Sequence, residues 1–124
     1  QHFMAVTRFE TIFIMTPVLS EQQMKETVER YLAFLKENKA KVIHEENWGL
    51  RKLAYPIQHK STGFYQLVEF ESEGSLIESL EVEFSRDEAI MRFLTVKLDK
   101  DGILYSQRRI EKQKNLDQKK AEIL

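Results

Sequence analysis

Apolar and polar positions repeat with two different periods along the first forty residues. Residues 9–17, FETIFIMTP, are dense in strand-forming side chains and end at a proline, which predicts a strand. Residues 21–38 carry apolar side chains at helical spacing. Ser20 and Gln23 stand three residues apart ahead of them, the spacing of a capping box. The pattern therefore predicts a strand followed by a capped helix.

The middle of the chain predicts a long β-hairpin. The extended segment AKVIHEENWGLRKLAYPI leads through the turn-forming residues QHKSTG into FYQLVEF. Gly49 indicates a bulge, and Pro56 indicates a strand at the edge of a sheet. Arg51 and Lys52 stand in the middle of this otherwise apolar arm, although charged side chains are costly in a core. We therefore interpret the arm as a binding element.

The second half of the chain repeats the helix and strand signals. Ser75 and Glu78 have the spacing of a second capping box, and the helix that follows is expected to end near Ser85. Residues 89–98, AIMRFLTVKL, predict a final strand. The order β-α-β-β-α-β predicts an α+β, ferredoxin-like fold, with a four-stranded antiparallel sheet and both helices on one face. Residues 9–17 carry large apolar groups on both faces, so a base, a partner or the tail is expected to cover the second face.

The length of the chain, 124 residues, fits a single domain, which we place at residues 4–102. Residues 1–3 precede a methionine followed by a small residue, so we interpret them as a cloning remnant. Residues 103–124 are polar and predict a mobile or helical tail. The sequence has no apolar run of roughly 20 residues and no signal-like start, so a cytoplasmic location without membrane contact is expected.

The distribution of charge is more informative than its total. The net charge of −1 argues against binding nucleic acid through a global positive field. Residues 39–60, however, hold five cations against two acids, and residues 85–124 hold ten against seven. Residues 61–84 hold six glutamates and no cation. Two basic segments can therefore meet a polyanion while the acidic one faces away, although mixed charges also simply solvate a surface.

The residue patterns of known catalytic sites are missing from the sequence. It contains no cysteine and nothing like H-E-x-x-H, and His44 and His59 are too far apart for a local metal motif. The segment TPVL follows the first predicted strand, and Pro17 there lacks the amide donor that an acyl-phosphate enzyme on this fold would need. We expect no catalytic residue, no metal, no cofactor and no small-molecule substrate.

Aromatic residues in the predicted strands suggest RNA binding. STGFYQLVEF resembles the glycine-aromatic segment of the RNA-recognition motif, and IFIMTP resembles its companion strand. With Gly63 and Phe64 as anchors, Gln66 stands where a second stacking aromatic belongs. A stand-alone single-stranded RNA-binding protein of this type is one alternative. A purely structural role for the strand aromatics is another, and it covers Phe13, Phe64, Tyr65 and Phe70.

A closer resemblance extends over residues 7–98. TRFETIFIMTPVL, the capped helix, NWGLRKLAYPIQHKSTGFYQLVEF and RDEAIMRFLTVKL are together similar to the bacterial small-subunit ribosomal protein six family, and WGLRKLAYPI is the most specific piece. The resemblance implies a non-enzymatic protein of the small ribosomal subunit. It also implies binding to the central domain of the small-subunit (16S) ribosomal RNA, together with ribosomal protein eighteen.

The resemblance also implies which side chains contact RNA. The matched basic positions are Arg8, Arg51, Lys52, Arg86 and Arg92. Trp48 and Tyr55 are further possible contacts to RNA or to the partner protein. Residues 103–124 have no matched role.

Overall fold

Four strands and two helices alternate along the chain in the predicted order, and a computed structural model describes them within residues 6–99, 102, 104, 107 and 108. The elements are β1 (Thr7–Met15), α1 (Glu21–Glu37), β2 (Lys41–Ile57), β3 (Lys60–Ser72), α2 (Ser75–Arg86) and β4 (Ile90–Lys97). The predicted cloning remnant, residues 1–3, lies outside the described residues, as does the predicted tail apart from residues 104, 107 and 108.

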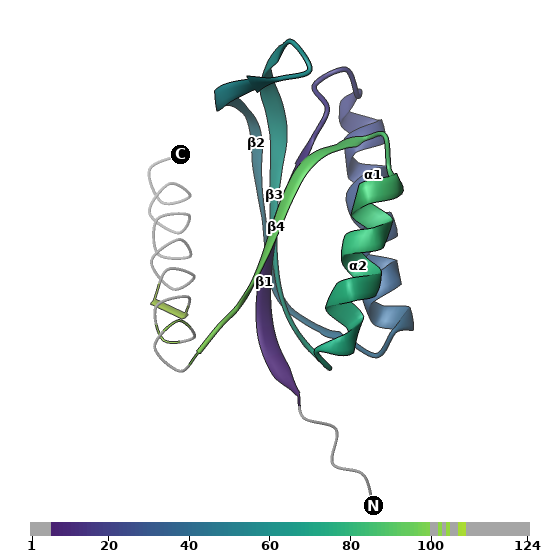
Figure 1. Cartoon of the computed structure of the whole chain (residues 1–124), viewed down its shortest axis with the longest axis vertical. Helices are drawn as coiled ribbons and strands as arrows, with labels where there is room; N and C mark the ends of the chain where they lie inside the picture. Colours follow the sequence, from purple (N-terminus) through teal and green to yellow (C-terminus); the bar gives the residue numbers. More distant parts are fainter. Residues whose placement is uncertain (1–5, 100–101, 103, 105–106, 109–124) are drawn as a thin grey trace, which may run out of the picture.

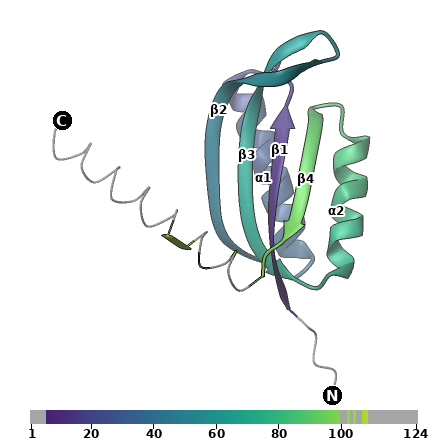
Figure 2. The same ribbon diagram turned by 60° about the vertical axis from the view of Figure 1, so that its left-hand side comes forward.

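The strands form one antiparallel sheet in the order β2-β3-β1-β4, and both helices lie on the same side of it (Figure 1). The predicted α+β, ferredoxin-like fold is therefore confirmed. Figure 2 shows the four strands side by side, with β2 and β4 at the edges. In the part of the chain that the structure describes, no helix is long and apolar enough to span a bilayer.

Helix α1 begins at the predicted capping box. The Ser20 Oγ accepts a hydrogen bond from the Gln23 backbone N–H at 3.1 Å, and the Gln23 Oε1 accepts one from the Ser20 N–H at 2.9 Å. These bonds satisfy two backbone donors that have no partner within the helix. The sequence thus correctly predicts where α1 starts.

Replacing Ser20 by alanine is expected to lower the free energy of unfolding by about 1 kcal/mol, because the cap bond to Gln23 is lost. Urea denaturation of the full chain measures the change. Ser85→Ala is the matched control, because Ser85 is an exposed serine within α2 and alanine suits a helix interior. Equal losses in the two variants would show that the Ser20 cap contributes nothing specific.

The second predicted capping box, Ser75 with Glu78, is wrong. The residue before α2 is Gly74, which already has helical angles (φ −60°, ψ −29°), and no side chain caps this helix. A capping serine needs an extended backbone to turn its hydroxyl back onto the helix, whereas Ser75 lies inside the first turn. The N–H groups of Leu76 and Ile77 instead donate to the carbonyls of Glu73 and Gly74.

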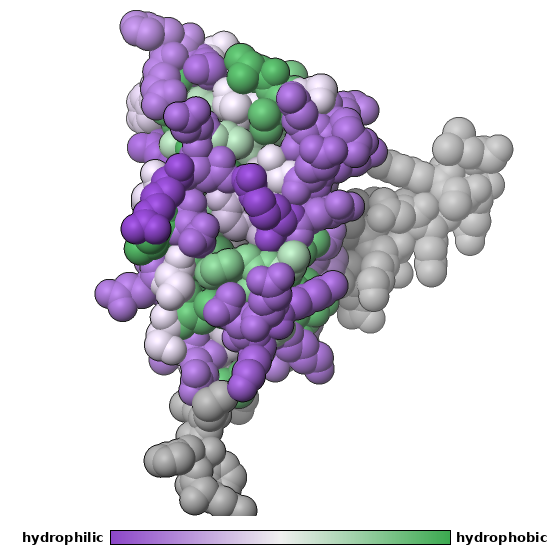
Figure 3. All heavy atoms as spheres, turned by 90° about the vertical axis from the view of Figure 1, so that its right-hand side faces the viewer, coloured by the Kyte–Doolittle hydropathy of each residue, from purple (hydrophilic) through white to green (hydrophobic). Residues whose placement is uncertain are grey.

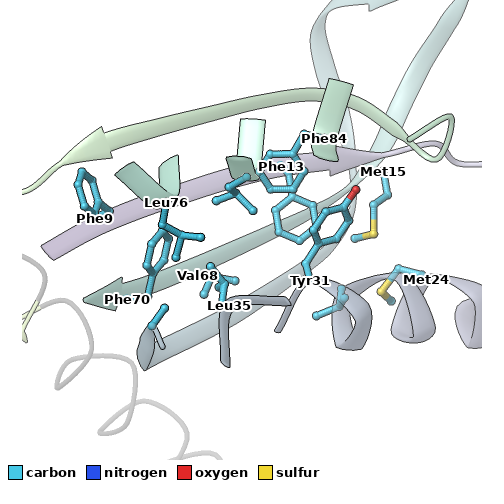
Figure 4. Packing of buried hydrophobic residues seen from close by; sticks show 13 residues of the cluster. Phe9, Phe13, Met15, Met24, Tyr31, Leu35, Val68, Phe70, Leu76 and Phe84 are labelled. Carbon is cyan, nitrogen blue, oxygen red and sulfur yellow. The ribbon is translucent and has the colours of Figure 1, made fainter. Parts of the chain in front are cut away.

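The core lies between the sheet and the helices (Figure 4). The ring centroid of Phe84 on α2 is 5.1 Å from that of Phe13 on β1 and 4.6 Å from that of Tyr31 on α1. These tilted contacts join the sheet to both helices. The buried residues of α2 are Leu76, Leu80 and Phe84, and the outward side of the helices is mostly hydrophilic (Figure 3).

The β2–β3 hairpin extends past the end of β1 and the start of β4 (Figure 2). Its register shifts between Asn47 and Gly49, and Gly49 has a φ of +74°, which confirms the predicted bulge. Trp48 is the extra residue of the bulge and has no residue opposite it on β3. Pro56 lies in the edge strand β2, as predicted, where its missing N–H interrupts no central ladder.

Candidate nucleic-acid interface

The sheet face opposite α1 and α2, here called the outer face, carries three rows of side chains. The row nearest the hairpin tip contains Arg92, Ile14, Tyr65 and Gly49. The next row contains Leu94, Ile12, Leu67 and Glu46. The third row contains Val96, Glu10, Glu69 and His44. The outer face thus changes from cationic and aromatic to acidic as it runs away from the hairpin tip.

A cluster of interacting side chains runs along β2 on the outer face toward the hairpin end, and it is called the Trp48 cluster here. Its members are His44, Glu46, Trp48, Arg51 and Tyr65. The Trp48 ring stacks on the Tyr65 ring, with centroids 6.1 Å apart and planes inclined by 17°. The Arg51 Cζ lies 5.1 Å from the Trp48 ring centroid, and the Arg51 Nε donates to the Trp48 carbonyl at 3.2 Å. Arg51 is therefore held over an aromatic ring, a cation–π arrangement.

Glu46 joins the other members of the Trp48 cluster. Its Oε1 accepts a hydrogen bond from the Trp48 Nε1 at 2.9 Å, and its Oε2 lies 3.0 Å from the His44 Nε2. Glu45, the preceding residue, pairs with Val68 and is exposed, whereas Glu46 pairs with Leu67 on the outer face. The two carboxylates thus belong to opposite faces of the strand and cannot form a local acid–base pair.

An apolar hollow of about 340 Å³ adjoins this cluster on the β1–β4 side. It is lined by Ile12, Ile14, Arg92, Phe93 and Leu94. The side chain of Leu94 is 62% exposed. The apolar residues expected on the second face of β1 are therefore present there, and the hollow offers a protein or a base apolar surface to cover.

Arg8 lies at the far end of the outer face and is already paired. Its Nη2 donates to the Glu71 Oε1 at 2.5 Å, and its Nη1 lies 3.4 Å from the Glu69 Oε2. The Glu69 side chain is fully buried and the Arg8 side chain is only 16% exposed. A buried carboxylate needs such a partner, so the position of Arg8 is that of a structural ion pair.

The other four cations implied by the resemblance lie on the surface, unlike Arg8. Arg51, Lys52, Arg86 and Arg92 are exposed. Among the residues that the structure describes, none of the four forms an ion pair within 4.0 Å. Their charges are therefore available to an external anion.

These four cations do not form one continuous patch. Arg51 and Lys52 pair with consecutive residues of β3, Gly63 and Thr62, so they project from opposite faces of the hairpin arm. Arg92 pairs with Ile14 and lies on the outer face, in the same row as Tyr65. The hairpin end of the molecule thus presents cations in more than one direction.

Arg86 lies at the end of α2, on the helix side of the sheet. It lines a hollow of about 450 Å³ in which Arg30 pairs with Asp87. The Tyr31 hydroxyl donates to the Asp87 Oδ2 at 2.7 Å. Burial, together with this hydrogen bond, raises the pKa of Tyr31 well above its ordinary value. Arg86 thus borders a structural ion pair without joining it.

The two aromatic candidates in the hairpin arm differ in their burial. Trp48 is half-buried within its cluster, whereas Tyr55 is 75% exposed. Tyr55 lies in the part of β2 between Lys52 and Ile57 that has no partner on β3. Tyr55 accordingly has no cross-strand neighbour on β3, whereas Trp48 is held by its stack on Tyr65.

The stacking positions taken from the RNA-recognition motif are wrong by one residue. Phe64 packs against the core and Gln66 is only 1% exposed, so both belong to the helix side. Tyr65 is the aromatic on the outer face. Residues 64, 66, 68 and 70 alternate along β3 and therefore share one face of the strand. Val68 and Phe70 lie in the core, so Tyr65 must lie on the opposite face, and these apolar residues are the signal that would have identified it. For Glu46 and His44 the sequence gives no comparable signal.

No cluster of side chains resembling a metal site occurs within the described ranges: no three His, Asp or Glu residues there are arranged to hold an ion. The arrangement at the hairpin end consists of exposed cations beside a stacked aromatic pair. Such groups can bind phosphates and bases.

Comparison with known proteins assigns the family. Residues 8–97 match the family model described as Ribosomal protein S6. The small ribosomal subunit protein bS6 of Phocaeicola vulgatus is 57% identical over 104 residues, which cover 84% of this chain and 91% of the relative. The protein of the same name from Christiangramia forsetii is 51% identical over 109 residues, covering 88% of this chain and 97% of the relative.

A solved structure agrees with these sequence relatives. The crystal structure of 30S ribosomal protein S6 from Thermotoga maritima superposes with a TM-score of 0.75 at 26% identity, covering 86% of this chain and 99% of that one. The names of these relatives are those of ribosomal proteins and not of enzymes. This chain therefore belongs to the ribosomal protein S6 family, whose members are proteins of the small ribosomal subunit.

Proposed function

We propose that this protein is a structural component of the bacterial small ribosomal subunit, in the cytoplasm, that binds the central domain of 16S ribosomal RNA together with ribosomal protein eighteen. The observation that carries the proposal is the hairpin end of the molecule. There Arg51 lies beside the stacked pair of Trp48 and Tyr65, Arg92 lies in the same row of the outer face as Tyr65, and both arginines are exposed. The membership of the chain in a small-subunit family supports the same reading.

In this proposal the four exposed cations contact phosphates. Guanidinium and ammonium groups that are not engaged in an ion pair bind phosphate oxygens through charge-assisted hydrogen bonds. Tyr55, at 75% exposure, is available for a sugar or a base. We leave Arg8 out of the contact set, because its guanidinium is occupied by Glu69 and Glu71. Its role in the proposal is to hold the far end of the outer face together.

The need for a protein partner follows from charge and from apolar exposure. With a net charge of −1, the chain has no global field to hold RNA. The hollow beside Leu94 offers a protein partner apolar surface to cover. Stand-alone binding of recognition-motif type has less support, because Phe64 and Gln66 face the helices.

The protein alone is expected to bind a central-domain RNA fragment weakly, and ribosomal protein eighteen is expected to raise its affinity. Cooperation supplies the binding free energy that the nearly neutral net charge does not. Titration of the protein into labelled RNA, with and without the partner at fixed salt, measures both affinities.

An unrelated single-stranded RNA of equal length is the control for non-specific binding. Tight binding to either RNA, unaffected by the partner, would argue for a stand-alone RNA-binding protein. Affinity for the ribosomal fragment that rises only with the partner present supports the proposed function.

A further inference from the structure

We propose that Glu46 is a positioning residue for RNA binding, which fixes the Trp48 ring and, through it, the guanidinium of Arg51. The inference rests on the proposed function, in which Arg51 contacts RNA. It assigns the role to a carboxylate, a group that RNA itself repels. Three interactions of Glu46, Trp48 and Arg51 carry it.

The first interaction holds the Glu46 carboxylate in a partly buried position. Its side chain is only 17% exposed and it pairs with Leu67, which is fully buried. Partial burial of a charge costs free energy unless hydrogen bonds replace the lost water. The Trp48 Nε1, at 2.9 Å, and the His44 Nε2, at 3.0 Å, occupy the two oxygens. An apolar residue would fill this position at lower cost, so the carboxylate points to a role beyond stability.

The second interaction is the placement of the Trp48 ring. As the extra residue of the bulge, Trp48 has no residue opposite it on β3 to fix its direction. The bond to Glu46 at one edge and the stack on Tyr65 at 6.1 Å fix the ring instead. Removing the Glu46 acceptor leaves the indole N–H without this partner and frees the ring to rotate.

The third interaction connects Trp48 to Arg51. The guanidinium lies over the indole ring at 5.1 Å, and the Arg51 Nε donates to the Trp48 carbonyl at 3.2 Å. An arginine that is already ordered loses less conformational freedom when it binds phosphate. The loss of this ordering is expected to weaken binding about three- to tenfold, which corresponds to the free-energy cost of immobilising one long side chain on binding.

The decisive experiment compares Glu46→Ala with Glu45→Ala. Both variants remove one negative charge from neighbouring positions, but Glu45 is exposed and belongs to the other face of β2. Charge alone predicts that each variant binds RNA as tightly as the parent chain or more tightly. The proposal predicts the opposite sign for Glu46→Ala alone. Both are titrated into the central-domain RNA fragment with ribosomal protein eighteen present.

Two further readouts separate positioning from general damage. Glu46→Gln keeps an oxygen acceptor for the Trp48 Nε1 and is expected to bind RNA within about twofold of the parent chain. Trp48 is the only tryptophan of the chain, so its fluorescence reports this site alone. Glu46→Ala is expected to shift the emission to the red and to increase quenching by acrylamide, and Glu45→Ala is expected to do neither.

The proposal is overturned if Glu46→Ala and Glu45→Ala bind RNA equally while Arg51→Gln binds more weakly. If Arg51→Gln itself binds like the parent chain, the assignment of Arg51 in the proposed function is what fails. Should Glu46→Ala not fold, Trp48→Phe decides, because it keeps an aromatic ring and removes the five-membered ring whose N–H reaches Glu46. RNA affinity equal to that of the parent chain in Trp48→Phe then also overturns the proposal.

Discussion

Replacing Arg51 and Lys52 together by glutamine is expected to weaken binding to the central-domain RNA about 20-fold near physiological salt, while leaving the fold nearly intact. Both residues are exposed and neither has an ion-pair partner among the residues that the structure describes. Exposed substitutions of this kind usually change the free energy of unfolding by less than about 0.5 kcal/mol. The loss should therefore appear in binding and not in stability.

Salt dependence identifies the lost contacts as phosphate contacts. Each contact contributes about 0.7 to 0.9 to the slope of log affinity against log salt, so the double variant should lose about 1.4 to 1.8. Affinities measured from low to moderate salt, with ribosomal protein eighteen present, give this slope. A double variant that unfolds, while its folded fraction keeps the parent affinity and slope, would show that the two cations stabilise the hairpin instead.

The matched control replaces Lys25 and Lys36 by glutamine. Both lysines are exposed on α1, outside the proposed interface, and their removal changes the net charge by the same amount. Their loss should leave the slope nearly unchanged. An equal loss of affinity in the two double variants would mean that RNA responds to total charge and not to the hairpin arm.

Arg8→Met is expected to lower the free energy of unfolding by about 3 kcal/mol, the lower end of the range for breaking a buried ion pair. The Glu69 side chain is fully buried, and Arg8 contributes one of its charge partners at 3.4 Å. Removing the guanidinium therefore leaves a buried carboxylate with less compensation. Urea denaturation measures the loss.

The double variant Arg8→Met with Glu69→Leu provides the control for this pair. Removing both charges should recover most of the lost stability, because no carboxylate remains to be compensated. Additive losses would show that Arg8 and Glu69 are not coupled. The folded Arg8→Met protein should keep the parent salt slope for RNA, whereas a reduced slope would return Arg8 to the RNA contacts.

The elements themselves could be predicted from the sequence because their signals are local. Apolar spacing and Ser20 with Gln23 located α1, and Gly49 located the bulge in β2. The predicted cap of the second helix was wrong, because Ser75 is already the first residue of the helix and Gly74 precedes it. Capping depends on backbone angles that the spacing of two residues does not report.

The strand faces were less predictable than the strands. An alternating pattern leaves open which of its two sets is buried when both sets carry apolar groups. This is the reason why Phe64 and Gln66 were assigned to the stacking face, although they belong to the helix side. Tyr65 became identifiable only through its pairing with Ile14 and its stack on Trp48.

The sequence by itself determined the order of elements, the fold and the family, because periodicity, turn residues and the segment WGLRKLAYPI are all properties of neighbouring residues. Only the tertiary structure decided which of the cations are already engaged. Arg8 meets Glu69 and Glu71 across more than sixty residues of chain, and Arg51 meets the face of Trp48 through a bulge. Such partners are selected by strand register and burial, which join distant parts of the chain and leave no pattern in the sequence around either residue.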